Sequence, residues 1–211
     1  MNRRRLLRLA ALFAVLAPPL ALRGAQRAVA AGAIDIEAIL NDPAAPAAGN
    51  AAGDVTIVAF MDYNCPFCKK SSPDLERFVD TDGAVRLVYK EWPILAPSSV
   101  YGARLALAAK YQGKYREAHL ALMGVHGGQI PEANMLDAVR AVGVNMDRLD
   151  EDLKAHDADI TALINRDKDQ ADSLGLQATP VFLIGPYKVE KALDYDEFKQ
   201  IVADFRARVA K

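Results

Sequence analysis

The sequence predicts an α/β fold in which a small sheet is interrupted by an all-helical insertion. Short apolar segments rich in β-branched residues occur at 55–61, 85–89 and 181–184, and such runs are typical of buried strands. A helical pattern follows the first of them, so the body of the chain begins with a strand–helix–strand unit. Between the second and the third segment, roughly 75 residues carry apolar side chains at helical spacing.

Length and composition are those of a globular protein. The chain has 211 residues, of which 52% are hydrophobic and 25% are charged, and its formal net charge is −1. These fractions exclude a disordered tail, a collagen-like repeat and a polytopic membrane protein. A dedicated nucleic-acid-binding protein normally has a basic excess, so we expect no nucleic-acid partner.

Residues 1–30 have the layout of a signal peptide. An arginine-rich start at 3–8 precedes an apolar run at 9–22, and Ala28-Val29-Ala30 fits a small-x-small cleavage site with the cut after Ala30. The apolar run is shorter than a bilayer span, which needs about 20 residues. The basic start suits either the Sec or the twin-arginine export route. We therefore predict a protein of the bacterial periplasm, where disulfides persist.

The boundaries of the remaining elements follow from capping residues, turns and proline positions. An N-terminal segment at 31–53 has a short helix at 34–40 and an exposed, irregular loop at 43–53. The sheet-containing domain comprises 54–96 and 176–211, with a helix from Cys65 to about Val79, a turn at 80–83, a strand at 187–190 and a last helix capped by Asp194. The helical insertion domain comprises 97–175, with helices at 98–110, 114–125, 131–142 and 145–174.

The chain has two cysteines, Cys65 and Cys68, at the start of the first long helix. A bridge between them closes a minimal loop and would stabilise the fold little, and two thiols are half of the ligands that structural zinc needs. We therefore interpret them as a redox pair with no metal. A helix N-terminus favours a thiolate, Pro66 suits the first helical position, and such placement lowers a cysteine pKa from about 8.5 to roughly 3.5–7.5. We predict Cys65 as the nucleophile and Cys68 as the resolving thiol.

Pro180 begins the last buried strand of the pattern. Proline lacks an amide proton, so a strand tolerates it only at an edge or at the first position. On its own this proline indicates a strand start, since cis X-Pro bonds are a minority.

Three segments occur in a characteristic order: Phe-Met-Asp-Tyr-Asn-Cys-Pro-Phe-Cys at 60–68, Glu-Trp-Pro-Ile-Leu at 91–95, and Ala-Thr-Pro-Val-Phe-Leu-Ile-Gly at 178–185. This arrangement resembles the DsbA family of thioredoxin-fold oxidoreductases. The resemblance implies a thioredoxin fold interrupted by the helical insertion, with Thr179-Pro180 as a cis-proline loop that packs beside Cys65 and binds an extended substrate peptide. It also implies disulfide transfer to exported cysteine-containing proteins and reoxidation by a membrane partner of the DsbB type. No cofactor beyond the Cys65–Cys68 disulfide is expected.

The sequence departs from the family pattern at three positions. Phe67 stands where the best-known oxidase has His between its cysteines, so we expect Pro66 and Phe67 to make a less oxidising pair. Ala59 stands where many relatives carry a buried Glu that handles the proton of the resolving thiol, and Glu91 or Asp62 are candidates for that proton relay. Thr179 is shared with isomerases as well as oxidases.

Three functions fit these residues. The first is an oxidase, and the second is an isomerase or reductase kept reduced by a membrane electron donor. The third, of another class, is a periplasmic copper-binding protein that uses the two thiolates as soft ligands. Only a few residues separate the predicted cleavage site from the first helix, which leaves little room for an oligomerisation segment, so we expect a monomer and favour the oxidase.

Overall fold

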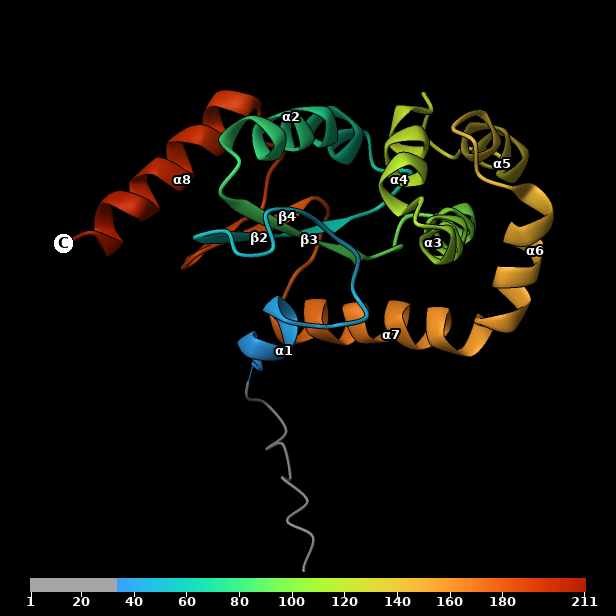
Figure 1. Ribbon diagram of the computed structural model, residues 1–211, viewed down its shortest axis with the longest axis horizontal. Coiled ribbons are helices and arrows are strands. Elements are labelled where there is room, and N and C mark those ends of the chain that lie inside the picture. Colours follow the sequence, from blue (N-terminus) through green and yellow to red (C-terminus); the bar gives the residue numbers. More distant parts are fainter. Residues whose placement is uncertain (1–33) are drawn as a thin grey trace, which may run out of the picture. The chain divides into compact units, whose positions relative to one another are not determined.

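Five strands form a mixed sheet at the centre of the computed structural model, which describes residues 34–211 (Figure 1). The strand order is β1-β3-β2-β4-β5. β2 runs parallel to β3, and the other neighbours are antiparallel. The strands are β1 (Ala47–Gly49), β2 (Val55–Met61), β3 (Val85–Glu91), β4 (Val181–Ile184) and β5 (Tyr187–Val189).

The register of the central strands determines which loops meet. Phe60, near the end of β2, pairs with Val181, the first residue of β4. Met61 pairs with Glu91 at the end of β3. The segments that follow β2 and β3 and the segment that precedes β4 therefore emerge at the same edge of the sheet.

Helices cover both faces of the sheet (Figure 1). α2 (Pro66–Asp82) and α8 (Tyr195–Val209) lie on one face, and α1 (Ile36–Leu40) and α7 (Asp157–Ser173) lie on the other. The remaining helices lie beside the sheet: α3 (Pro97–Ala109), α4 (Tyr115–Gly124), α5 (Glu132–Ala141) and α6 (Met146–Ala155), with a short 3₁₀ turn, η1 (Lys110–Gln112), between α3 and α4.

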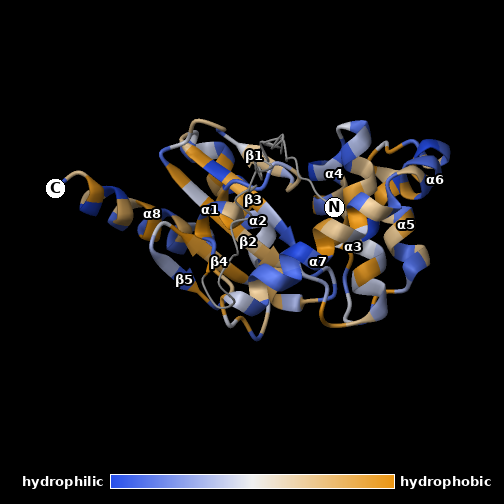
Figure 2. Ribbon diagram, turned by 90° about the horizontal axis from the view of Figure 1, so that it is seen from below, coloured by the Kyte–Doolittle hydropathy of each residue, from blue (hydrophilic) through white to orange (hydrophobic). Residues whose placement is uncertain are grey.

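Alternate residues of β2 enter two different cores. Ile57 and Ala59 belong to the larger apolar cluster under α2 and α8, whereas Val58 and Phe60 belong to a smaller cluster on the face of α1 and α7. Successive side chains of a strand point to opposite faces, so a strand covered on both sides is apolar throughout. Figure 2 shows hydrophobic colour over much of the central sheet, interrupted by the polar residues of its strands.

The structure confirms the α/β fold class with helices between β3 and β4. α3 to α7 fall within the predicted insertion at 97–175, and the described residues belong to one compact unit; the division into separate domains stays a prediction. The predicted signal peptide and its cleavage site lie outside the described residues. Within 34–211, no helix is both long and apolar enough to cross a membrane.

Three predicted segments differ from the structure. Most of the turn predicted at 80–83 is helical, because α2 continues to Asp82 and ends only at Gly83, which has a φ of 70°. The loop at 43–53 contains β1, which adds to the edge of the sheet by pairing with β3. Its small residues have little strand propensity, and the conformation is set by close packing: Gly49 has a φ of 73°, and a Cβ there would lie 2.3 Å from the oxygen of Val85. The single helix predicted at 145–174 is broken at His156, which has a non-helical ψ of 19° and stacks on Tyr111 with ring centroids 3.6 Å apart.

Candidate active site

The two cysteines occupy the first turn of α2. Cys65 is the N-cap residue, with extended backbone angles (φ −79°, ψ 118°), and its Sγ accepts a hydrogen bond from the main-chain N–H of Cys68 at 3.4 Å. Pro66 takes the first helical position, where its missing amide proton costs no hydrogen bond. Both cysteines are free thiols, and both are buried. The predicted placement of Cys65 at a helix N-terminus is therefore what the structure contains.

A cis peptide bond joins Thr179 to Pro180 at the start of β4. The Cys65 thiol donates a hydrogen bond to the main-chain oxygen of Thr179 at 3.2 Å. The Thr179 hydroxyl is buried and has no hydrogen-bond partner among the described residues. The structure thus brings together Cys65, Thr179 and Pro180 from two segments that are far apart in the sequence.

The pKa of the Cys65 thiol is lowered, whereas the pKa of the Cys68 thiol is raised. Hydrogen bonding from the Cys68 thiol is the largest cause that lowers the pKa of Cys65 to about 6; burial opposes it, and contacts with Thr179 and the first amides of α2 add to it. Burial raises the pKa of Cys68 well above its usual value, and the neighbouring Cys65 sulfur adds to that effect. Near neutral pH, Cys65 is therefore mainly a thiolate and Cys68 a thiol.

Phe67 lies between the two cysteines in the sequence and is exposed to solvent. Its side chain is 62% exposed. A phenyl ring cannot donate a hydrogen bond to a thiolate or place a positive charge beside it. The lowered pKa of Cys65 therefore depends on main-chain and thiol hydrogen bonds and on the end of the helix.

Asp62 anchors the loop that carries Cys65. Its Oδ1 accepts hydrogen bonds from the N–H of Asn64 and the hydroxyl of Ser99, both at 2.7 Å. Its Oδ2 accepts from the main-chain N–H groups of Ile94 and Leu95 at 2.7 and 2.9 Å. These four contacts give Asp62 a positioning role; the proton-relay role predicted for it stays a prediction.

Asn64 is a site residue that the sequence did not single out. Its side-chain amide donates to the hydroxyls of Ser98 and Ser99 at 3.0 and 2.9 Å, and its Oδ1 accepts from the N–H of Ile130 at 2.7 Å. Asn64 directly precedes Cys65, and these hydrogen bonds connect it both to the start of α3 and to the segment after α4. Its partners lie 34 to 66 positions away, so no local pattern could have revealed this role.

Glu91, the other candidate proton relay, is buried in a hydrogen-bonded cluster. Its Oε1 accepts from the hydroxyls of Tyr63 and Tyr115 at 2.6 and 2.7 Å. Burial raises the pKa of Glu91 to about 8, while these two hydrogen bonds act in the opposite direction. No hydrogen bond joins Glu91 to either cysteine among the described residues, so its relay role also stays a prediction.

His119 extends this cluster toward α2. Its Nδ1 lies 2.9 Å from the Tyr63 hydroxyl and its Nε2 lies 3.4 Å from the hydroxyl of Ser72. Burial lowers the pKa of His119 to about 3, so the ring is neutral. Because the Tyr63 hydroxyl donates to Glu91, Nδ1 carries the proton and Nε2 accepts from Ser72. Ser72 lies one turn after Cys68 on the same face of α2.

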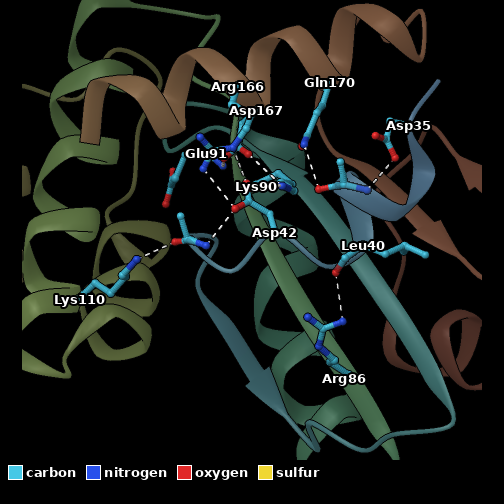
Figure 3. A network of polar contacts seen from close by, with 12 residues as sticks. Asp35, Leu40, Asp42, Arg86, Lys90, Glu91, Lys110, Arg166, Asp167 and Gln170 are labelled. Atoms are coloured by element: carbon cyan, nitrogen blue, oxygen red, sulfur yellow. Dashed lines mark hydrogen bonds and ion pairs between the residues drawn. The ribbon is translucent and has the colours of Figure 1, made fainter. Parts of the chain in front are cut away.

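A charged cluster on the other face of the sheet supports the position of Glu91 (Figure 3). The buried Lys90 ammonium lies 3.1 Å from Asp167 Oδ1 and 3.6 Å from Asp42 Oδ2, and Arg166 donates to Asp42 Oδ2 at 2.6 Å. Burial raises the pKa of Asp167 to about 6. Asp167 Oδ2 accepts the main-chain N–H of Glu91 at 3.0 Å. This cluster fixes α7 to β3 and holds the backbone at Glu91.

The donor set at the cysteine pair offers two thiols and no third ligand of a common metal-binding type. Within residues 34–211, no group of three or more His, Cys, Asp or Glu side chains is arranged to hold a metal ion. Structural zinc needs four ligands, so the pair does not fit a structural zinc site.

The fold and the paired thiols of a Cys-X-X-Cys motif beside a cis-proline define a thioredoxin-fold protein. The family model described as Thioredoxin matches residues 41–204. The chain belongs to this family and is DsbA-like within it, which confirms the resemblance noted in the sequence.

Solved structures with the same fold come from several bacteria. A thioredoxin-like oxidoreductase from Silicibacter pomeroyi DSS-3 is 40% identical, with a TM-score of 0.75 over 81% of this chain and 97% of its own. The thiol-disulfide exchange protein alpha-DsbA2 from Wolbachia pipientis is 27% identical, with a TM-score of 0.75 over 80% and 91%. A periplasmic thioredoxin-like protein from Salmonella enterica serovar Typhimurium is 28% identical, with a TM-score of 0.69 over 82% and 96%.

Curated relatives of the chain are much longer proteins. Na(+)/H(+) antiporter NhaA 3 of Salinispora tropica is 29% identical over 144 residues, and NhaA 1 of Salinispora arenicola is 28% identical over 181 residues. The chain spans only 22% and 27% of their lengths.

Proposed function

We propose that the chain is a periplasmic thiol–disulfide oxidase that introduces disulfide bonds into exported proteins by exchange at Cys65 and Cys68. The observation that carries this proposal is that the pKa values of the two thiols are shifted in opposite directions. The pKa of Cys65 is lowered to about 6 beside the cis-proline loop, whereas burial raises the pKa of Cys68. One sulfur is therefore suited to enter and leave mixed disulfides, and the other to stay protonated until it is needed.

The proposed reaction begins with the oxidised enzyme. A substrate thiolate attacks the Cys65 sulfur, the Cys65–Cys68 bond breaks, and Cys68 leaves as a thiolate that takes up a proton. A second substrate thiolate then attacks the substrate sulfur of the mixed disulfide and releases Cys65 as a thiolate. The substrate loses two electrons and gains a disulfide, and the enzyme pair gains two electrons and becomes the dithiol.

The main chain at Thr179 is suited to hold the substrate during this exchange. The oxygen of Thr179 faces Cys65 Sγ at 3.2 Å in the dithiol state. An extended substrate peptide that pairs with the start of β4 would place its reacting sulfur beside Cys65 Sγ. The exposed ring of Phe67 offers an apolar contact beside it.

The pKa of Cys65 also favours an oxidase of moderate strength. A thiolate that is stable at neutral pH stabilises the reduced enzyme, which makes the disulfide a stronger oxidant. The pKa of about 6 lies between about 3.5, the value in a strongly oxidising Cys-X-X-Cys pair, and about 7, the value in thioredoxin. This intermediate value fits the replacement of the usual histidine by Phe67.

The proposed location and partner follow from the same chemistry. The arginine-rich start and the cleavage pattern at Ala30 support export, and a similar structure is described as periplasmic. Each turnover leaves a dithiol, so an electron acceptor must restore the disulfide. We assign that role to a membrane protein of the DsbB type, and we propose that the chain acts as a monomer.

The proposal is tested by trapping the thiols of the protein in extracted periplasm with an alkylating reagent. An oxidase is recovered mainly as the disulfide. Recovery mainly as the dithiol would contradict the oxidase and favour the isomerase or reductase. The matching assay in solution is oxidation of a reduced, unfolded test protein by the purified disulfide form, which should proceed with one disulfide formed for each enzyme pair reduced.

A further inference from the structure

A groove of about 510 Å³ lies directly beside the reactive cysteine. One wall is the outer face of α2, and the other is the end of α4 with the glycine-rich segment that follows it. Pro66, the residue after Cys65, is one of the residues that line the groove. The side chains that line the groove are those of Pro66, Lys69, Lys70, Pro73, Met123 and His126.

The charge of this groove is opposite to that of the protein around it. Residues 34–211 contain 20 Lys and Arg against 27 Asp and Glu, yet the groove has two lysines and no acidic residue in its lining. Neither Lys69 nor Lys70 takes part in an ion pair with a carboxylate of the described residues. The Lys69 charge is close enough to interact with the sulfur of Cys65. Asp62 and Glu197 are close enough to interact with Lys69 and Lys70 respectively, but neither forms an ion pair with them, so the lining of the groove itself presents positive charge beside Cys65.

The two walls of the groove are joined by specific hydrogen bonds. The Lys69 ammonium donates to the main-chain oxygens of Val125 and Gly127 at 2.5 and 3.1 Å. Asn64 holds the same segment from its other end through the N–H of Ile130. The groove is thus a preformed part of the site, and Lys70, which is exposed, is free to contact a ligand.

We propose that this groove binds an acidic stretch of the substrate polypeptide next to its reacting cysteine. The inference rests on the proposed oxidase function and adds a substrate preference to it. Apolar walls of proline and methionine suit the extended backbone, and the lysines suit Asp or Glu side chains. Substrate cysteines flanked by acidic residues react with Cys65 faster than cysteines in neutral or basic surroundings.

The test uses three synthetic peptides, each with two cysteines, in which the first cysteine is flanked by Glu, Gln or Lys residues. Oxidation by the full-length disulfide form is followed by acid quench and chromatography of reduced and oxidised peptide. Each rate is divided by the rate of the same peptide with a small neutral disulfide, because flanking charges also change the peptide's own thiol pKa. We expect the Glu peptide to exceed the Gln peptide by about two- to fivefold, with a smaller ratio in added salt.

Matched lysine variants locate the effect. Lys70→Gln should remove most of the preference for the Glu peptide. Lys154→Gln, an equal charge change at an exposed position of α6, should leave it intact. Equal corrected rates for all three peptides with the unaltered protein, or equal loss in both variants, would overturn the groove assignment while the oxidase function stands. Failure to oxidise any peptide would instead overturn the oxidase function.

Discussion

The Cys65 thiol lies 3.2 Å from the main-chain oxygen of Thr179, although 114 positions separate the two residues. This contact exists because β2 and β4 are neighbours in the sheet and Phe60 pairs with Val181. The reactive sulfur and the peptide edge at the cis bond are therefore built on the same two strands. A rigid sheet, rather than a flexible loop, sets their separation.

The two cysteines should have different mutant phenotypes. Cys65→Ser removes the sulfur that exchanges with substrate, so oxidation of a reduced test protein should fall to the uncatalysed rate. Cys68→Ser cannot form the enzyme disulfide, but its Cys65 thiolate can still attack the disulfide of an oxidised substrate and release the other substrate sulfur as a thiolate. No Cys68 thiol remains to displace the bound substrate, so Cys65 should accumulate as a mixed disulfide, measurable by mass spectrometry of the intact adduct. A wild-type rate in Cys65→Ser would show that the roles are wrongly assigned.

The lowered pKa of Cys65 should appear in reactivity and in stability. Alkylation of the reduced protein should follow a titration with a midpoint near pH 6. A folded pKa below the unfolded value of about 8.5 gives stability that is present above pH 8.5 and is lost as the pH falls through 6. The unfolding free energy of the reduced form, relative to the disulfide form, should therefore rise over this interval, with the raised pKa of Cys68 opposing the rise at its upper end. A flat difference between pH 6 and 8.5 would contradict the thiolate.

Phe67 should limit the oxidising power of the pair. Phe67→His places an imidazole beside Cys65, so the thiolate is further stabilised, and the reduction potential should become more positive by about 30 mV or more, a change of about 1.4 kcal/mol. The measurement is equilibration with glutathione redox buffers. Phe67→Gln is the control, because it is polar without a cationic form and should move the potential much less. Equal shifts in both variants would exclude charge as the cause.

Asp62 should contribute to stability through its four acceptor contacts. Asp62→Ala leaves the N–H groups of Ile94 and Leu95 and the Ser99 hydroxyl without their partner, so we expect a loss of about 3 kcal/mol in denaturant unfolding. Asp74→Ala, which removes only a surface pair with Arg77, should cost under about 0.5 kcal/mol. Similar losses in the two variants would mean that the loop does not depend on Asp62.

Elements whose own residues have a clear strand pattern or a helix-capping motif could be predicted from the sequence. β2 and β4 are apolar and β-branched, and α8 begins with a capping box in which Asp194 and Glu197 bond each other's backbone. β1 could not be predicted, because its Ala and Gly residues form a strand only when β3 is beside them. The break at His156 had a weak signal, since Asp157 and Asp159 suit the first turn of a new helix.

The residues of the candidate site likewise fall into those that the sequence could predict and those that it could not. Cys65, Cys68 and Pro180 stand out because their residue types are rare and their chemistry is specific. Asn64, Tyr63 and His119 act through partners on other elements, so their roles depend on how α3 and α4 pack against the sheet. Glu91 could be named from the sequence, but its burial among tyrosines could not.

Glu91 should destabilise the fold at high pH. Its folded pKa of about 8 lies above the ordinary value of 4.5 because the side chain is buried. Such a group gives full stability below pH 4.5 and loses it as the pH rises through 8. Glu91→Gln cannot ionise, so its unfolding free energy relative to the unaltered protein should increase across this interval. Both proteins are measured in the disulfide form, so the cysteines do not titrate. The titration of Asp167 is present in both proteins and cancels in the comparison.

The same variant tests the proposed proton relay. If Glu91 handles the proton of Cys68, Glu91→Gln should also slow resolution of a preformed mixed disulfide and change the pH profile of that step. If Glu91 only holds Tyr63 and Tyr115 in place, the stability curve should change and the resolution rate should not. Tyr115→Phe removes one donor to the same oxygen and serves as the comparison, because a relay through Tyr63 would survive it. A resolution rate altered equally in both variants would indicate a general loosening of the cluster rather than proton transfer.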